Sequence, residues 1–239
     1  MNRLLIPLLA LMLTACNVGG IPDKVLDIAE SRMDTTGYVG RTIPVGAYHS
    51  LLVDGFASVR YNAQTTGGAR VEVRVHPDYA DSLRVEVRDS VLRLGMEGTT
   101  SVKLDDAETL KPYYTATVYG PAPRGVTLAG AGRLELGQWQ SPAALTVRLT
   151  GAANVEATLV EAPTLTLVLS GTGRIDLPSV ALGHLDATVS GVGDIRLGGT
   201  AQEARFAVSG VGNIDADRLS VAGQVDRQVS GMGRIRADK

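Results

Sequence analysis

The stretch SGVGDIRL, residues 190–197, decides the fold because it is one of six related copies along the chain. The first glycine of the copies falls at residues 130, 151, 171, 191, 210 and 231, so the steps are 21, 20, 20, 19 and 21 residues. A repeat of about 20 residues that holds only strand and turn residues predicts a β-solenoid with one rung per repeat. The copies are AGAGRLEL (129–136), TGAANVEA (150–157), SGTGRIDL (170–177), SGVGDIRL (190–197), SGVGNIDA (209–216) and SGMGRIRA (230–237).

Within a rung, the apolar residues and both glycines share one parity along the chain. One example is the series Leu165, Leu167, Leu169, Gly171, Gly173, Ile175 and Leu177. Because successive side chains of a strand point to opposite faces, this parity predicts a face that fills the lumen of the solenoid. We expect the glycines where the wall bends, or where an opposite strand leaves no room for a side chain.

The last rung departs from this pattern. Arg227 takes the place that earlier rungs give to Val147, Leu167, Ala187 and Phe206. A terminal repeat needs a more polar end, because an open apolar end invites further stacking. We therefore expect Arg227 to belong to a C-terminal cap.

Strands are also expected before the repeats. ARVEVRV (69–75) and LRVEVRDSVLRL (83–94) alternate apolar and charged residues, the second with a turn at Asp89–Ser90, which is typical of strands buried on one side. The sequence thus predicts an all-β chain, with a β-rich N-terminal region over 41–120 and a repeat solenoid over 121–239.

The N-terminus, MNRLLIPLLALMLTAC, is typical of a secretion signal. Arg3 gives a positive start, and Leu4 to Leu13 form an apolar run too short to span a bilayer as a helix. LTAC resembles the bacterial lipobox, which implies a signal peptide over 1–15 and an acyl anchor such as palmitate on Cys16. Cys16 is the only cysteine; a free thiol after an ordinary signal is the alternative.

Residues 16–40 would then form a lipidated tether, either disordered or with a short helix over 23–34. We expect the protein to be bound to a membrane of the bacterial cell envelope through Cys16. That membrane would be the outer one if the host has two, with the body facing the periplasm or the exterior.

Several classes of function are disfavoured. The formal net charge of −2 gives no attraction for nucleic acid. Each GxG phrase is followed by strand residues rather than by the helix that a phosphate-binding loop needs. His49, His76 and His184 lie far apart, and no H-E-x-x-H or G-x-S-x-G motif occurs. We expect no catalytic residue, no resident metal and no cofactor.

Three carboxylates follow the central aliphatic residue of successive repeats. Glu135, Glu156 and Asp176 would stack about 4.8 Å apart in a solenoid and would repel one another unless balanced. Arg133 and Arg174 share their face, so a solvated charge ladder is one interpretation. The other is a site for a hard cation such as Ca²⁺, which takes several oxygen ligands.

The residue between the two glycines becomes more apolar toward the C-terminus. Val192, Val211 and Met232 would face outward and could form a partner surface or a self-association face, unless a loop or the tether covers them. Aromatic residues are few. Tyr113, Tyr114, Tyr119 and Trp139 could line a glycan groove, although such residues more often pack in a core or seam.

The repeated phrases, together with VEVRVHPDYADSLRVEVRDSVLRLGM (71–96) and YYTATVYG (113–120), resemble the head GIN domain family of adhesin-like proteins over residues 42–237. The sequence departs from the pattern at Ala153, which replaces a glycine. The resemblance implies a right-handed parallel β-helix at the cell envelope and no known catalytic site.

We therefore expect a non-enzymatic, lipid-anchored binding or adhesion module whose partner is an envelope protein or a surface glycan. The alternatives are a polysaccharide-active enzyme on a β-helix and a purely structural envelope protein. The oligomeric state stays open.

Overall fold

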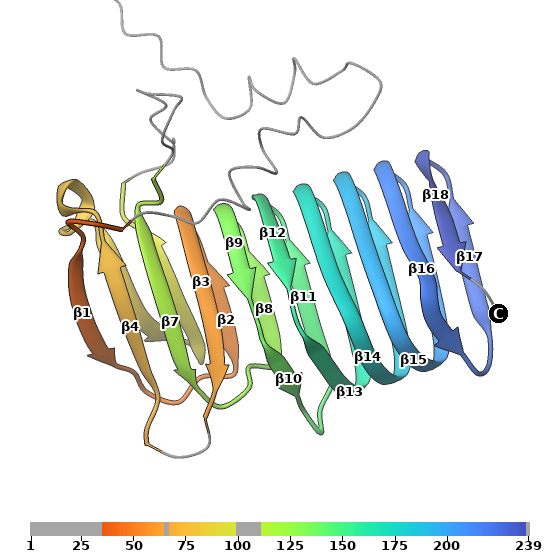
Figure 1. Cartoon of the computed structure of the whole chain (residues 1–239), viewed down its shortest axis with the longest axis horizontal. Coiled ribbons are helices and arrows are strands. Elements are labelled where there is room, and N and C mark those ends of the chain that lie inside the picture. Colours follow the sequence, from red (N-terminus) through yellow and green to blue (C-terminus); the bar gives the residue numbers. More distant parts are fainter. Residues whose placement is uncertain (1–34, 65–66, 99–110, 238–239) are drawn as a thin grey trace, which may run out of the picture.

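The computed structural model describes residues 35–64, 67–98 and 111–237. Within these ranges the chain forms eighteen strands and one short 3₁₀ turn, with no α-helix. The strands stack along the long axis of the molecule from β1 at one end to β18 at the other (Figure 1). The prediction of an all-β solenoid is confirmed. The expected signal peptide, Cys16 and the tether up to residue 34 lie outside the described residues.

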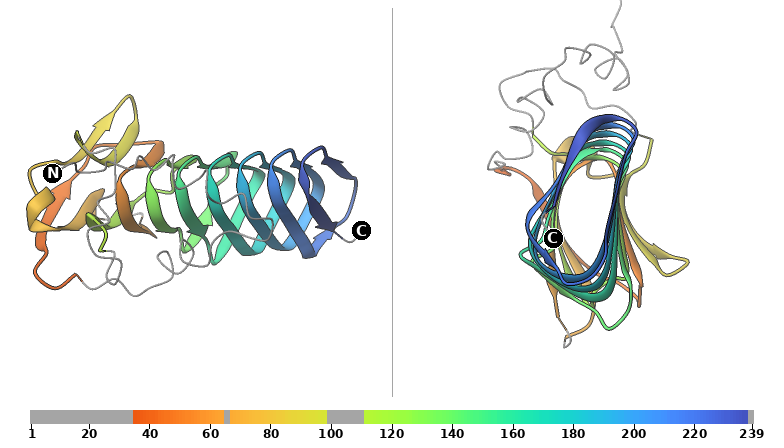
Figure 2. Two further views of the ribbon diagram at one scale, coloured as in Figure 1. Left: turned by 90° about the horizontal axis from the view of Figure 1, so that it is seen from above. Right: turned by 90° about the vertical axis from the view of Figure 1, so that its right-hand side faces the viewer.

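The repeat region forms coils whose strands pair in parallel and in register. Ile175, for example, lies between Val155 of the preceding coil and Ile195 of the next. Seen along the stack, the coils superimpose as flattened ovals (Figure 2). The strands of this region are β8 (Gly125–Leu128), β9 (Ala131–Glu135), β10 (Gln138–Gln140), β11 (Leu145–Leu149), β12 (Ala152–Glu156), β13 (Leu159–Leu169), β14 (Thr172–Val189), β15 (Val192–Val208), β16 (Val211–Val221), β17 (Val225–Val229) and β18 (Met232–Ala237).

The N-terminal region mixes antiparallel and parallel pairs. β4 pairs antiparallel with β1 and β7, and β5 forms a hairpin with β6. Asp89 and Ser90 have φ values of 51° and 61°, as a two-residue hairpin turn requires, which confirms the predicted turn. The elements are β1 (Val39–Pro44), β2 (Ser50–Val53), β3 (Phe56–Ala63), β4 (Arg70–Val75), the 3₁₀ turn (Pro77–Tyr79), β5 (Leu83–Arg88), β6 (Val91–Met96) and β7 (Tyr114–Gly120).

One further coil precedes the first repeat. β2 pairs in parallel with β8, and β3 pairs in parallel with β9, so Gly55 and Ala57 take the places of the two motif glycines. This coil lacks the repeat motif, because Asp-Gly-Phe-Ala at residues 54–57 replaces Ser-Gly-x-Gly. Its Arg60 nevertheless lies in register with Glu135 of the first repeat.

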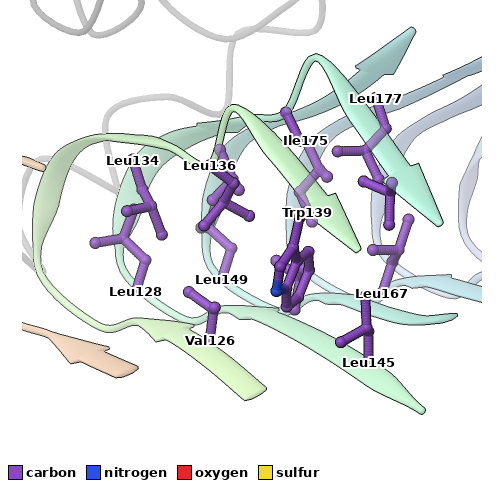
Figure 3. Packing of buried hydrophobic residues seen from close by; sticks show 14 of the residues in the cluster. Val126, Leu128, Leu134, Leu136, Trp139, Leu145, Leu149, Leu167, Ile175 and Leu177 are labelled. Carbon is purple, nitrogen blue, oxygen red and sulfur yellow. The ribbon is translucent and has the colours of Figure 1, made fainter. Parts of the chain in front are cut away.

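The lumen is filled as the parity predicts. Leu167, Ala187 and Phe206 succeed one another in register, and each is fully buried. Leucine, valine and isoleucine side chains from both walls meet in the interior around Trp139 (Figure 3). Each buried aliphatic side chain contributes about 1.5–3 kcal/mol of transfer free energy before chain entropy is counted.

The first glycine of each motif lies at a bend of the wall, which confirms one of the two predicted causes. A Cβ on Gly193 would lie 1.9 Å from the carbonyl oxygen of Gly173 in the preceding coil, and its φ of +149° disfavours any other residue. The obstacle is therefore the neighbouring coil along the stack, not an opposite strand across the lumen.

The last coil leaves its inner face open. Arg227 lies in register with Phe206, as expected, and its guanidinium donates a hydrogen bond to the carbonyl oxygen of Ala237. Val229 on the same strand is 48% exposed. A charged side chain thus occupies the last place of the apolar lumen column.

Candidate functional site

A groove of about 1030 Å³ runs along one wall of the stack, across β3, β9, β12, β14, β15 and β16. Its lining is formed by Arg60, Tyr61, Asn62, Ala63, Arg133, Glu135, Gly137, Gln138, Glu156, Ala157, Thr158, Asp176, Pro178, Arg196, Leu197, Gly198, Asp215 and Arg218. With coils about 4.8 Å apart, five coil-to-coil steps give a groove roughly 24 Å long. This length suits an extended chain better than a small metabolite.

The floor of the groove lies where each strand turns the corner of its coil. β15 turns this corner with one residue fewer than its neighbours, because the pairing shifts between Leu177 and Val180 on one side and between Arg196 and Gly198 on the other. Gly198 is buried there, and a Cβ on it would lie 2.5 Å from the carbonyl oxygen of Pro178. The repeat steps of 19 and 21 residues are the sequence signal of this irregularity.

One column of charged side chains follows the groove from coil to coil. The pairing places these residues in successive register: Arg60, Glu135, Glu156, Asp176, Arg196, Asp215 and Arg236. Glu135, Glu156 and Asp176 are thus consecutive, as predicted. The repeat spacing does not bring Arg60 or Arg218 to this surface, because Arg60 belongs to the coil without the motif and Arg218 follows the register shift.

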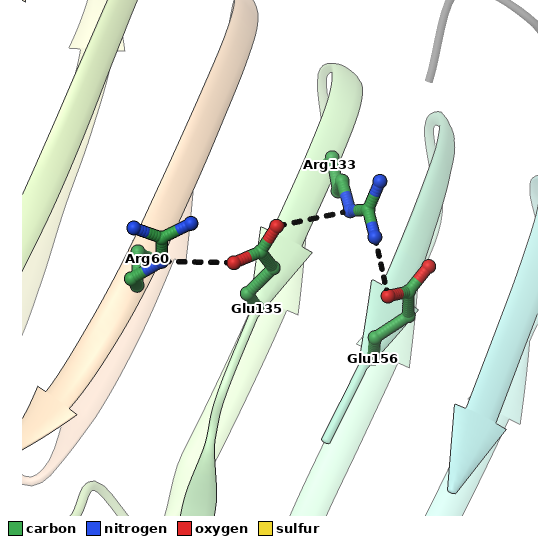
Figure 4. A network of polar contacts seen from close by, with 4 residues as sticks. All are labelled: Arg60, Arg133, Glu135 and Glu156. Atoms are coloured by element: carbon green, nitrogen blue, oxygen red, sulfur yellow. Dashed lines mark hydrogen bonds and ion pairs between the residues drawn. The ribbon is translucent and has the colours of Figure 1, made fainter. Parts of the chain in front are cut away.

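Arginines balance the first two carboxylates of this column. Glu135 accepts from Arg60 at 2.8 Å and lies 3.2 Å from Nε of Arg133, while the other end of Arg133 reaches Glu156 at 2.5 Å (Figure 4). The four side chains form one chain of alternating charge across three coils. Ion pairs on a partly exposed surface contribute about 0–1 kcal/mol each, so these pairs fix the positions of the side chains more than they stabilise the fold.

This geometry favours the charge ladder over the cation site. Among the described residues, no group of three or more His, Cys, Asp or Glu side chains could hold a metal ion. Glu135 and Glu156 instead face guanidinium groups, which compete with any cation for the same oxygens.

The far part of the groove is different. Asp176, Arg196, Asp215 and Arg218 alternate in sign, and within the described residues none of the four makes an ion pair. Asp176 and Asp215 are half-buried and both arginines are exposed. Asp215 accepts one hydrogen bond, from the backbone N–H of Asp217 at 3.3 Å, but its charge, like the other three, is not balanced by an ion pair within the described residues and can pair with a ligand.

A smaller hollow of about 470 Å³ adjoins the groove and shares Arg60 and Glu135 with it. It lies on the outer face of β1, β4 and β7, and contributes Arg41 and Arg74 together with threonine hydroxyls. Arg74 donates to Thr35 at 3.4 Å. The polar surface therefore extends toward the N-terminal end of the stack.

The apolar column faces outward, as predicted. Val192, Val211 and Met232 lie in register and are 40%, 43% and 71% exposed. They stand at the corner formed by the motif glycines, apart from the groove residues. That they form a partner surface or a self-association face stays a prediction.

The aromatic residues do not form a glycan platform. Tyr113, Tyr114 and Trp139 are buried, with the indole N–H of Trp139 donating to the carbonyl oxygen of Pro123 at 2.9 Å. Tyr119 lies under the guanidinium of Arg70, 4.0 Å from the ring centroid. The interpretation of these residues as core and seam packing is confirmed for the three buried ones.

The histidines serve local structure. His76 accepts from the backbone N–H of Asp78 at the start of the 3₁₀ turn, and His184 lies 3.6 Å from Glu203, its register partner in the next coil. His49 is exposed. None of the three lines the groove. In the part of the chain that the structure describes, no helix is long and apolar enough to cross a membrane.

Solved structures share the fold at low sequence identity. A putative adhesin from Bacteroides fragilis is 19% identical with a TM-score of 0.66, covering 85% of this chain and 98% of that one. A putative lipid binding protein from Parabacteroides distasonis is 20% identical with a TM-score of 0.69, covering 87% and 100%. A putative adhesin from the same species is 20% identical with a TM-score of 0.68, covering 84% and 82%.

No curated protein matches the chain. A family model does match, over residues 47–238, and therefore includes the extra coil, all six repeats and every residue of the groove. The chain belongs to the head GIN domain family, whose members are described as putative auto-transporter adhesins.

Proposed function

We propose that this protein is a lipid-anchored, non-enzymatic binding module of the bacterial cell envelope that holds an extended polymer along its groove. The observation that carries the proposal is the continuity of the groove across six coils. Its polar side chains point away from the lumen and are not needed to fill the core. The adhesin-like description of the family agrees with a role at the cell surface or envelope.

The ligand we propose is a surface glycan or an extended segment of an envelope protein. Either would present a repeating backbone to a wall that itself repeats about every 4.8 Å. Arginines, carboxylates and the amides of Asn62 and Gln138 offer both donors and acceptors along this path. A polar, open groove of this kind makes many weak contacts, so we expect micromolar rather than nanomolar affinity.

Attachment to the membrane rests on the LTAC sequence and Cys16. The test is metabolic labelling with an alkyne analogue of palmitate, comparing the wild type with Cys16→Ser. We expect label and membrane fractionation in the wild type only. Label that persists in Cys16→Ser would contradict the anchor.

Binding is tested with the full-length protein in a non-ionic detergent, against purified surface polysaccharide and solubilised envelope proteins immobilised on beads. Asp176 and Asp186 are half-buried, outward-facing aspartates of β14 on opposite walls of one coil. We expect Asp176→Arg to weaken capture at least tenfold and Asp186→Arg to leave it unchanged. Equal capture by both variants would remove the groove as the binding site.

An enzymatic function on polysaccharides is the alternative, because Glu135 and Glu156 lie beside Arg133 within the groove. The two carboxylates are already ion-paired, which suits a recognition surface better than a proton donor. Release of soluble oligosaccharides from the captured polymer, lost in Glu156→Gln, would favour the enzyme. The third alternative, a purely structural protein, predicts no capture at all.

A further inference from the structure

The two halves of the groove differ in how their charges are satisfied. In the first half, Arg60, Glu135, Arg133 and Glu156 neutralise one another through three contacts of 2.5 to 3.2 Å. In the second half, Asp176, Arg196, Asp215 and Arg218 line the same groove, and no ion pair among the described residues involves them. Charged side chains that a protein leaves unpaired in a concave surface can pair with a ligand.

The backbone explains why the second half is open. Gly198 contributes no side chain to the corner between Pro178 and Arg218, and it could not carry one, since a Cβ would lie 2.5 Å from the Pro178 carbonyl oxygen and 3.4 Å from Cβ of Arg218. Arg196 precedes this glycine by two residues, and Arg218 is its register partner in the next coil. Arg196 and Arg218 therefore lie on either side of a position of the wall, Gly198, that has no side chain.

The signs of the charges select the chemistry of the ligand. Asp176, Arg196 and Asp215 succeed one another in register, about 4.8 Å apart from coil to coil. A polyanion would meet both aspartates and a polycation would meet both arginines, and like charges at this spacing repel. A ligand that carries both signs within a few ångströms meets no such repulsion.

The lengths of the side chains also determine how the positive and negative groups of a ligand would be oriented. An aspartate carboxylate stays close to the wall, where both are half-buried, whereas a guanidinium extends further out and both arginines are exposed. An ammonium group would therefore approach the wall at the aspartates. A phosphate or carboxylate would be held further out by the planar forks of the arginines, which bind such groups in a bidentate manner.

We propose that the second half of the groove is a subsite for a zwitterionic group, in which an ammonium lies next to a phosphate or a carboxylate. This inference rests on the proposed function, since it names the chemistry that the polymer would carry at this point. Asp176 and Asp215 receive the ammonium, and Arg196 and Arg218 receive the anion.

The test uses the full-length protein in a non-ionic detergent and three small probes: O-phosphoethanolamine, inorganic phosphate and ethanolamine. Binding is followed by chemical-shift changes of amides in β15 and β16. We expect O-phosphoethanolamine to bind about tenfold more tightly than either single-charge probe, and to weaken as salt screens the charges. Vesicles with phosphoethanolamine headgroups, compared with the soluble probe, distinguish a lipid source from a soluble or polymer-borne one.

Matched variants locate the site. Arg196→Gln with Arg218→Gln removes the proposed anion contacts, whereas Arg148→Gln with Arg205→Gln removes two exposed arginines from the opposite wall. We expect the first pair to abolish the preference for O-phosphoethanolamine and the second to preserve it. Phosphate binding as tight as O-phosphoethanolamine, or no binding of any probe, would overturn the subsite.

The polymer capture described above separates this inference from the proposed function. If the wild type captures the polymer and Arg196→Gln with Arg218→Gln captures it equally well, the subsite fails while the function stands. If the wild type captures nothing, the proposed function itself fails.

Discussion

Gly191 lies against Gly171 so closely that a Cβ on Gly191 would be 2.0 Å from the carbonyl oxygen of Gly171. That same oxygen accepts a hydrogen bond from the backbone N–H of Val192 at 2.9 Å. The absence of a side chain at the glycines and the hydrogen bonds between coils therefore depend on each other. The coils can approach to hydrogen-bonding distance at this corner only because the glycine positions carry no side chains.

Gly191→Ala should consequently destabilise the protein strongly. The new methyl meets backbone atoms that cannot move without separating two coils, so we expect a loss of about 3 kcal/mol or more. Urea unfolding followed by circular dichroism measures it. Gly40→Ala is the control, because no atom lies within 4 Å of a Cβ at that exposed position of β1. Equal midpoints for the two variants would contradict the role of the column.

The periodic part of the fold could be predicted from the sequence, because burial in a stacked coil repeats with every rung. Leu167, Ala187 and Phe206 keep one parity, and the structure buries all three. The coil of β2 and β3 could not be found in this way, since Phe56 and Ala57 pair with Ala131 and Gly132 without sharing their sequence motif.

The groove could be predicted only in part. The column of Glu135, Glu156 and Asp176 follows from the repeat, but its arginine partners do not. Arg60 comes from the unrecognised coil, and Arg218 reaches the groove through a register shift whose position within the coil the 19- and 21-residue steps leave open. Residues that reach the groove through irregularities of the repeat cannot be predicted from the repeat period.

The ladder makes Arg133 the shared counter-ion of two carboxylates. Replacing it by Gln leaves Glu135 and Glu156 facing each other in neighbouring coils, and we expect a loss of about 1 kcal/mol that shrinks in high salt. Adding Glu156→Gln should recover most of that loss. Thermal unfolding at low and high salt measures both variants.

Calcium provides a separate test of the same column. We expect millimolar Ca²⁺ to leave the melting temperature of the wild type unchanged, because arginines already pair with Glu135 and Glu156 and no group of three or more acidic, His or Cys side chains among the described residues could hold a metal ion. A rise in melting temperature that Glu156→Gln abolishes would instead support the cation site.

Tyr48 links stability to alkaline pH. Its hydroxyl is buried and, among the described residues, has no hydrogen-bond partner; burial raises its pKa to about 12. This pKa lies above the value of about 10 in the unfolded chain. The contribution of the neutral Tyr48 side chain to the free energy of unfolding is therefore fully present below pH 10 and is lost as the pH rises through 12. Burial also raises the pKa of Tyr61, so unfolding should begin above pH 10.

Tyr48→Phe removes an unsatisfied hydroxyl and should be neutral, or stabilising by about 1 kcal/mol, with a smaller loss of stability above pH 10. Tyr114→Phe is the contrasting variant. Its hydroxyl donates toward the carbonyl oxygens of Asp54 and Leu94 at 2.7 and 2.9 Å, and the loss of these buried hydrogen bonds should cost about 1–2 kcal/mol. Urea titrations at pH 7 and pH 11 measure both. The same cost for both variants at pH 7 would contradict this assignment.

Arg227 should keep the open end of the stack from adding further coils. Arg227→Leu extends the apolar lumen column to the end of the molecule, and the outer backbone edges of β17 and β18 are then free to pair with another chain. We expect the variant to associate with increasing concentration in sedimentation velocity, with no loss of folded structure. Arg148→Leu, an exposed position of β11 away from the open end, is the control and should behave as the wild type. Arg227→Leu that sediments as the wild type would show that the cap lies elsewhere.

The apolar column at the glycine corner is the remaining candidate for a partner surface. Val192→Asp with Val211→Asp places two charges on side chains that are 40% and 43% exposed, so the fold should tolerate both and the melting temperature should change little. We expect the double variant to be less self-associated than the wild type in light scattering after gel filtration. Val39→Asp is the control, because Val39 is 41% exposed on β1, at the other end of the stack. If the double variant unfolds, the valines pack against a part of the chain that covers them. If it associates as the wild type does, the column is not a contact between copies.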